Sequence, residues 1–150
     1  MIKRIVAAVA VITVVVSGAV SAQAAQGTQA TRLSATETIT LQSEGGTVAH
    51  GAAYLTYSLF SRQTKVVLRV TGLSKGVHLA HIHVGASCLS NGEPKYSLRS
   101  LVSAGVRSIA GSTTMVRANV LHKALYINVH GTTRSVLKVV ACGALSSTAM

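Results

Sequence analysis

The sequence predicts an all-β domain, an antiparallel β-sandwich or barrel of seven to eight strands. Apolar and polar residues alternate over 65–71, where Val66, Leu68 and Val70 share one face, and again over 125–130. Past residue 24, no stretch has the 3.6-residue apolar period of a helix. Turn signals rich in glycine and small polar residues separate the β-rich segments at 44–46, 72–76, 90–92 and 131–133.

The remaining strands are expected in segments rich in β-forming residues, at about 37–43, 47–60, 78–84, 97–102, 112–120 and 135–142. Together the strands define one domain over 37–146, which is long enough to bury one core and too short for two. Residues 25–36 are small, polar and without periodicity, so we expect a flexible lead-in there.

The N-terminal residues have the three zones of a secretory signal peptide. Lys3 and Arg4 precede an apolar run over 5–16, and Ala22-Gln23-Ala24 matches an A-x-A cleavage site. We therefore expect cleavage after residue 24, with no transmembrane span in the mature chain. That chain would be secreted to the periplasm or the extracellular space. A retained membrane anchor is the alternative.

The mature chain is expected to be strongly basic. Without Lys3 and Arg4 it has twelve Lys and Arg residues against three Glu and no Asp, a net charge of +9. Such a domain could attract small anions or an anionic cell-envelope surface, besides a metal ion. Nucleic acid is not an expected partner, because the sequence has no Trp and one Phe to stack on bases. A solvated basic surface without a partner is the alternative.

Cys88 and Cys142 are the two cysteines of the sequence. In an exported chain an even number of cysteines predicts a disulfide. The bridge would close a loop of about 55 residues and so stabilise the domain by about 4 kcal/mol. Two free thiols are the alternative.

A His-x-His sequence places two imidazoles on one face of a strand. Side chains at positions i and i+2 share a face, so His81 and His83 are expected side by side. The apolar Ala80, Ile82 and Val84 would then form the buried face of the same strand. The two histidines are therefore expected outside the core.

A third histidine, His130, faces away from the apolar Ile127 and Val129 on its own strand. Imidazole ligands suit copper and zinc, and three of them leave one coordination position open. We expect His81, His83 and His130 to form a metal site. A surface cluster that binds nothing is the alternative.

Two more histidines are candidates for an extra ligand. His50 stands at the start of an expected strand, and His122 shortly before the strand that begins near 125. Surface positions without function are the alternative for both.

The sequence resembles copper-zinc superoxide dismutases over residues 47–145. Residues 76–83, Gly-Val-His-Leu-Ala-His-Ile-His, resemble that family's G-L-H-G-F-H-V-H segment, 127–130 its V-V-H strand, and 141–143 its A-C-G sequence. The resemblance implies a dismutase-like Greek-key β-sandwich with a Cys88–Cys142 bridge. By the same resemblance, three histidines are copper ligands and a fourth supports them from outside the ligand set: His81, His83 and His130, with His78.

The sequence also departs from the dismutase pattern. His122 is the single histidine between His83 and His130, and the chain has no aspartate, so zinc is not expected in that family's site. Val139 stands where the family has the arginine that guides superoxide. Little or no dismutase turnover is therefore expected, and no catalytic residue is assigned.

A second resemblance is to the chordin-type (CHRD) domain. Residues 80–83, Ala-His-Ile-His, and 126–130, Tyr-Ile-Asn-Val-His, are similar to its A-H-I-H-x-G and Y-x-N-V-H signatures. The resemblance implies a secreted β-sandwich module, with no catalysis implied by the motif.

Three functions remain open. We favour a secreted, dismutase-like protein that binds copper with little or no dismutase turnover. The alternatives are a chordin-type structural or interaction module without tight metal binding, and an active copper-only superoxide dismutase. Whether the protein is an enzyme stays open, although the departures from the dismutase pattern favour a protein without enzymatic activity. If it is an enzyme, we expect a superoxide dismutase.

Overall fold

Eight β-strands, all paired antiparallel, make up the protein in a computed structural model that describes residues 34–121, 123–132 and 138–145. The strands are β1 (Ser34–Ser43), β2 (His50–Ser58), β3 (Gln63–Thr71), β4 (Gly76–Val84), β5 (Pro94–Ser103), β6 (Ala110–Val116), β7 (Leu125–Thr132) and β8 (Val139–Ala144). Within these ranges no helix is long and apolar enough to cross a membrane. The prediction of an all-β fold is confirmed.

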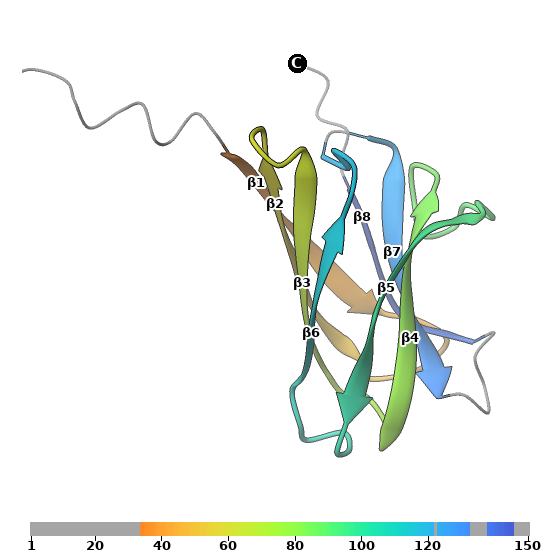
Figure 1. The fold of residues 1–150 in the computed structure, drawn as a ribbon. Coiled ribbons are helices and arrows are strands. Elements are labelled where there is room, and N and C mark those ends of the chain that lie inside the picture. The colour runs from red at the N-terminus through yellow and green to blue at the C-terminus, as the bar shows by residue number, and fades with distance from the viewer. Residues whose placement is uncertain (1–33, 122, 133–137, 146–150) are drawn as a thin grey trace, which may run out of the picture.

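The strands lie in the order β5-β4-β7-β8-β1-β2-β3-β6 and form the two layers of a sandwich (Figure 1). One layer contains β1, β2, β3 and β6, and the other contains β5, β4, β7 and β8. The pairs β3–β6 and β4–β7 join strands that are not consecutive, as in a Greek key. The second of these pairs positions the histidines discussed below.

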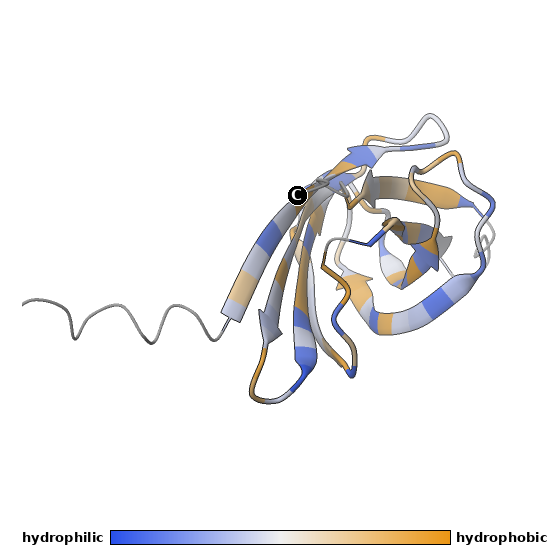
Figure 2. Cartoon of the chain, turned by 90° about the horizontal axis from the view of Figure 1, so that it is seen from above, coloured by the Kyte–Doolittle hydropathy of each residue, from blue (hydrophilic) through white to orange (hydrophobic). Residues whose placement is uncertain are grey.

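Strand β1 connects the two layers. Residues Ser34 to Leu41 pair with β2, whereas Gln42 and Ser43 pair with β8. At the opposite edge, the backbone N–H of Arg99 donates to Oγ1 of Thr114 at 2.7 Å and so links β5 to β6. The sandwich is therefore nearly closed, as the view from above shows (Figure 2).

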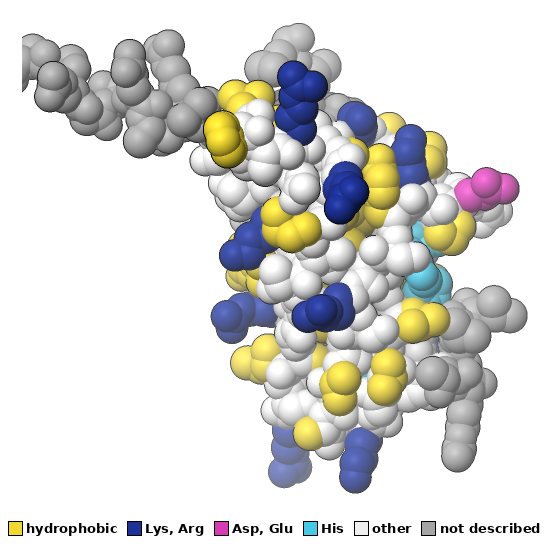
Figure 3. Space-filling view, in the orientation of Figure 1, with side chains coloured by type: hydrophobic (Ala, Val, Ile, Leu, Met, Phe, Trp, Pro, Cys, Tyr) yellow, Lys and Arg dark blue, Asp and Glu magenta, His cyan; other side chains and the backbone are white. Residues whose placement is uncertain are grey.

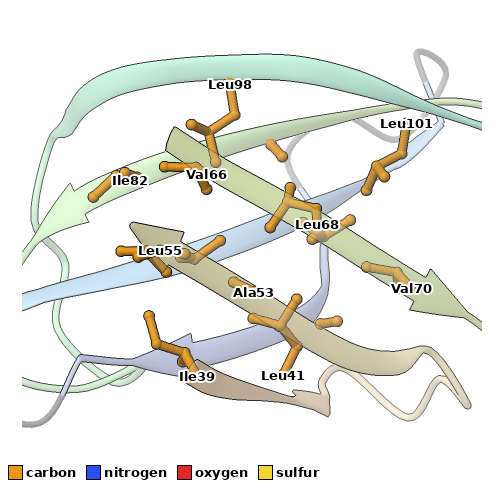
Figure 4. Packing of buried hydrophobic residues seen from close by; sticks show 14 of the residues in the cluster. Ile39, Leu41, Ala53, Leu55, Val66, Leu68, Val70, Ile82, Leu98 and Leu101 are labelled. Atoms are coloured by element: carbon orange, nitrogen blue, oxygen red, sulfur yellow. The ribbon is translucent and has the colours of Figure 1, made fainter. Parts of the chain in front are cut away.

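The core fills the space between the layers with aliphatic side chains from alternate strand positions (Figure 4). In β3, Val66, Leu68 and Val70 are buried while Lys65 and Arg69 are exposed, as the alternation predicts. Fully burying a side chain such as Leu68 contributes about 1.5–3 kcal/mol. Val84 departs from its expected buried position, since it is the last residue of β4 and is 46% exposed.

Some element boundaries differ from those expected. β1 begins at Ser34, inside the expected lead-in, because Ser34, Ala35 and Thr36 pair with the end of β2. The strand expected over 112–120 is β6, which ends at Val116 and not at 120. The signal peptide of 1–24 and the lead-in up to residue 33 lie outside the described residues.

The predicted disulfide is confirmed between Cys88 and Cys142. It joins the β4–β5 loop, residues 85–93, to β8, across 54 positions of sequence. Closing a loop of that length stabilises the fold by about 4 kcal/mol in the chain-entropy model.

Candidate metal centre

Adjacent strands β4 and β7 bring three histidines to one face. In the register of this pair, His81 lies opposite Asn128 and His83 opposite Tyr126. His130 is two residues beyond Asn128, so it projects from the same side of the sheet. This face is directed away from the aliphatic core, as the spacing of the histidines predicts.

The three imidazoles form a compact group. One ring nitrogen from each of His81, His83 and His130 lies within 4.8 Å of the other two. Three nitrogens bound to one ion at 2.0–2.1 Å are about 3.3–3.6 Å apart. Small rotations of the side chains would therefore bring all three onto a common ion.

His83 is already oriented as a ligand. Its Nδ1 lies 2.9 Å from the carbonyl oxygen of Gly92, so this nitrogen donates and carries the proton of the neutral ring. Its Nε2 then has a free lone pair, and this atom is buried with no hydrogen-bond partner in the described part of the chain. Metal-bound histidines usually have this arrangement, with the second ring N–H donated to a carbonyl.

Tyr126 fixes the position of both His83 and the loop that holds it. Its ring stacks on His83 with centroids 5.0 Å apart and an angle of 19° between the planes. Its hydroxyl donates to the carbonyl oxygen of Ser90 at 2.5 Å and accepts from the N–H of Gly92 at 3.1 Å. The side chain of Tyr126 thus sets the place of the carbonyl that orients His83.

Gly92 is required at its position by close packing. A Cβ there would overlap the backbone oxygen of Val84. The missing side chain lets the loop approach the end of β4, where the N–H of Val84 donates to the oxygen of Glu93 at 3.3 Å. The same approach brings the Gly92 carbonyl to His83.

The surroundings of His81 favour its neutral form. Burial lowers the pKa of His81, and the nearby His83 lowers it further by charge repulsion. Nδ1 of His81 is buried without a hydrogen-bond partner among the described residues. A neutral imidazole is the form that binds a metal, so His81 is suited to act as a ligand at neutral pH.

His78 lies behind the cluster and contacts the main chain of one of its members. The side chain is buried, with Nδ1 2.8 Å from the carbonyl oxygen of His130 and Nε2 2.9 Å from that of Ser74. His78 therefore ties the backbone at His130 to the β3–β4 turn.

Of the two candidates for an extra ligand, the structure describes His50. His50 is exposed, with Nδ1 2.9 Å from the carbonyl oxygen of Val48, and does not belong to the histidine group. His122 lies outside the described residues.

The sequence reasoning missed Tyr126 and Asn128. Both face away from the aliphatic core, yet they are only 2% and 7% exposed, because they share the face with the histidines and, at Tyr126, with the covering 85–93 loop. Two features of the sequence could have indicated that these side chains are buried. Tyr126, Asn128 and His130 alternate with the core residues of β7, and the Cys88 bridge draws the loop over that face.

The fold and the site define a disulfide-linked β-sandwich that carries a cluster of three histidines on an outer face. The family model of the CHRD domain matches residues 30–135, which include seven of the eight strands. The chain belongs to the CHRD domain family. No match to a curated protein was found. The comparisons thus support the CHRD resemblance and give no support to the dismutase one.

Proposed function

We propose that this chain works as an extracellular structural and interaction module of the CHRD type. The observation that carries the proposal is the CHRD match over residues 30–135, since domains of this family are typically extracellular. The Cys88–Cys142 disulfide supports the same compartment, because disulfides persist where the surroundings are oxidising.

Recovery of the expressed full chain tests this proposal. The protein is expected in the extracytoplasmic fraction, without its first ~24 residues and about 2 Da lighter than its reduced form because of the disulfide. A Cys88→Ser/Cys142→Ser double variant should show no mass change on reduction. Recovery in the cytoplasm with two alkylatable thiols would contradict the proposal.

A second candidate function is the binding of one copper ion by His81, His83 and His130. The observation that favours it is the state of His83, whose Nδ1 is occupied by the Gly92 carbonyl while its buried Nε2 is left to a ligand. Nitrogen sites bind Cu²⁺ more tightly than the other divalent first-row ions. Three protein ligands would leave a coordination position open to water or a small anion.

Titration of the metal-free protein with Cu²⁺ and Zn²⁺, followed by calorimetry, tests this candidate. One Cu²⁺ per chain is expected. His83→Ala should weaken its affinity by about 100-fold or more, since a ligand is lost. His50→Ala is the matched control and should leave the affinity unchanged. Absence of copper binding in the wild type would eliminate this candidate and leave the extracellular module.

A further inference from the structure

The face formed by β3, β6 and β5 is basic. Lys and Arg side chains are spread over it in Figure 3, whereas acidic side chains are confined to one edge of the view. The described acidic residues lie elsewhere, with Glu37 in β1, Glu44 after β1 and Glu93 before β5. The positive charge of this face is therefore not balanced by carboxylates on its own strands.

Two arginines line a hollow in this face. The hollow has a volume of about 540 Å³, and we call it the basic groove. Its polar lining comes from two arginines, two hydroxyl residues and one glycine: Arg69, Arg99, Ser112, Thr113 and Gly111. No acidic or aromatic side chain belongs to its lining.

Strand register explains why the basic groove is open around Arg69. Arg69 lies between Ala52 of β2 and Gly111 of β6, and neither neighbour has a side chain that could cover it. Arg99 is held on the far side of β6, because its backbone N–H donates to Oγ1 of Thr114. Both arginine side chains are exposed and can turn toward a ligand in the groove.

The charge continues along β3 beyond the groove. Lys65 is exposed on the same face as Arg69, four residues away, which is about 13 Å along a strand. A single small anion cannot contact both residues. An extended polymer with repeated negative charges can, so the spacing favours a linear polyanion.

We propose that the basic groove binds a linear anionic polysaccharide. Guanidinium groups bind carboxylate, sulfate and phosphate in bidentate fashion, and the hydroxyl of the exposed Thr113 can pair with those of sugars. Single-stranded nucleic acid is disfavoured, because the groove has no aromatic side chain for base stacking.

The proposal names a partner for the extracellular module proposed above and is independent of the metal centre. Calorimetry of the purified mature protein at about 0.15 M salt tests it with two probes, heparin fragments and polygalacturonate. The wild type should bind both and should not bind neutral dextran. Arg69→Ser/Arg99→Ser should lower the affinity at least tenfold, without changing the melting temperature, since both side chains are exposed.

The control is a second variant with the same net charge, Lys123→Ser/Lys138→Ser. These exposed lysines precede β7 and β8 of the other layer, and their loss should change the affinity less than threefold. An equal loss in both variants would show attraction by net charge alone and overturn the proposal. Tighter binding to oligo-dT or to phosphatidylglycerol vesicles, lost in the groove variant, would overturn it too. Either failure leaves the extracellular role intact, because that role is tested by where the chain is recovered.

Discussion

At the scale of single residues, His83 is the most constrained member of the histidine cluster. Its ring is fixed by the Gly92 carbonyl on one edge and by the face of Tyr126, which leaves Nε2 as the one nitrogen open to a ligand. His81 and His130 complete the group from neighbouring positions on β4 and β7. Ligand geometry therefore depends on a tyrosine that does not itself belong to the cluster.

Removal of the Tyr126 hydroxyl should weaken metal binding. Tyr126→Phe keeps the stacked ring but loses the hydrogen bonds to Ser90 and Gly92, so the carbonyl that orients His83 is less well fixed. We expect Cu²⁺ affinity to fall about tenfold and the free energy of unfolding to fall by about 1–2 kcal/mol. Tyr54→Phe, at an exposed tyrosine, is the control for both. Unchanged Cu²⁺ affinity in Tyr126→Phe would show that the tyrosine hydroxyl does not support metal binding.

The lowered pKa of His81 predicts a pH dependence of stability. Burial, and then the charge of His83, disfavour protonation of His81 in the folded protein. The unfolded chain therefore binds more protons, and stability falls as the pH drops from the ordinary histidine value of about 6.5 through the lowered pKa.

Urea denaturation of the metal-free protein across this pH range measures the effect. His81→Asn removes the titrating group, so the difference in unfolding free energy between wild type and variant should change as the pH falls. A constant difference would contradict the prediction.

At the scale of elements, the β4–β5 loop of residues 85–93 supports the histidine cluster. It is anchored to β8 by the Cys88–Cys142 bridge and to β7 through Tyr126. Along the sequence, this loop presents only a turn signal and a cysteine. The loop covers the histidine face because of contacts with β7 and β8, which are distant in sequence and so cannot be predicted from a local pattern.

Loss of the disulfide should affect both stability and the site. Cys88→Ser/Cys142→Ser frees the loop that presents the Gly92 carbonyl to His83. We expect the free energy of unfolding to fall by about 4 kcal/mol and Cu²⁺ affinity to fall about tenfold. Denaturation and copper titration of the oxidised wild type and the variant measure the two effects. A variant that is less stable but binds copper equally well would show that the bridge does not support the site.

The strands themselves were largely predictable, because alternation of apolar and polar residues is local. The shared face of His81 and His83 followed from their spacing alone. The approach of His130 did not, since it depends on the pairing of β4 with β7 across about 50 residues of sequence. The same alternation predicted that Val84 is buried, whereas the structure shows it exposed at the end of β4.

At the scale of the whole molecule, a copper-loaded form should be a poor superoxide dismutase. Its positive charge would attract superoxide. However, Val139 stands where the dismutase pattern has a guiding arginine. The dismutase pattern also has several histidines after the His-x-His strand, one of which bridges the two metals, whereas this chain has only His122 between His83 and His130. We expect kcat/KM far below the diffusional ceiling of about 10⁸–10⁹ M⁻¹s⁻¹. Pulse radiolysis measures it, and a rate near that ceiling, abolished by His81→Ala, would contradict the prediction.

The two pairings of β1 have a consequence for the order of folding. Gln42 and Ser43 pair with Cys142 and Ala141, about 100 residues later in the chain. Contacts so distant in sequence form slowly, because a long loop must close first. The layers cannot be joined through β1 until β8 has been synthesised. The β1–β8 junction is therefore among the last contacts that the emerging chain can form.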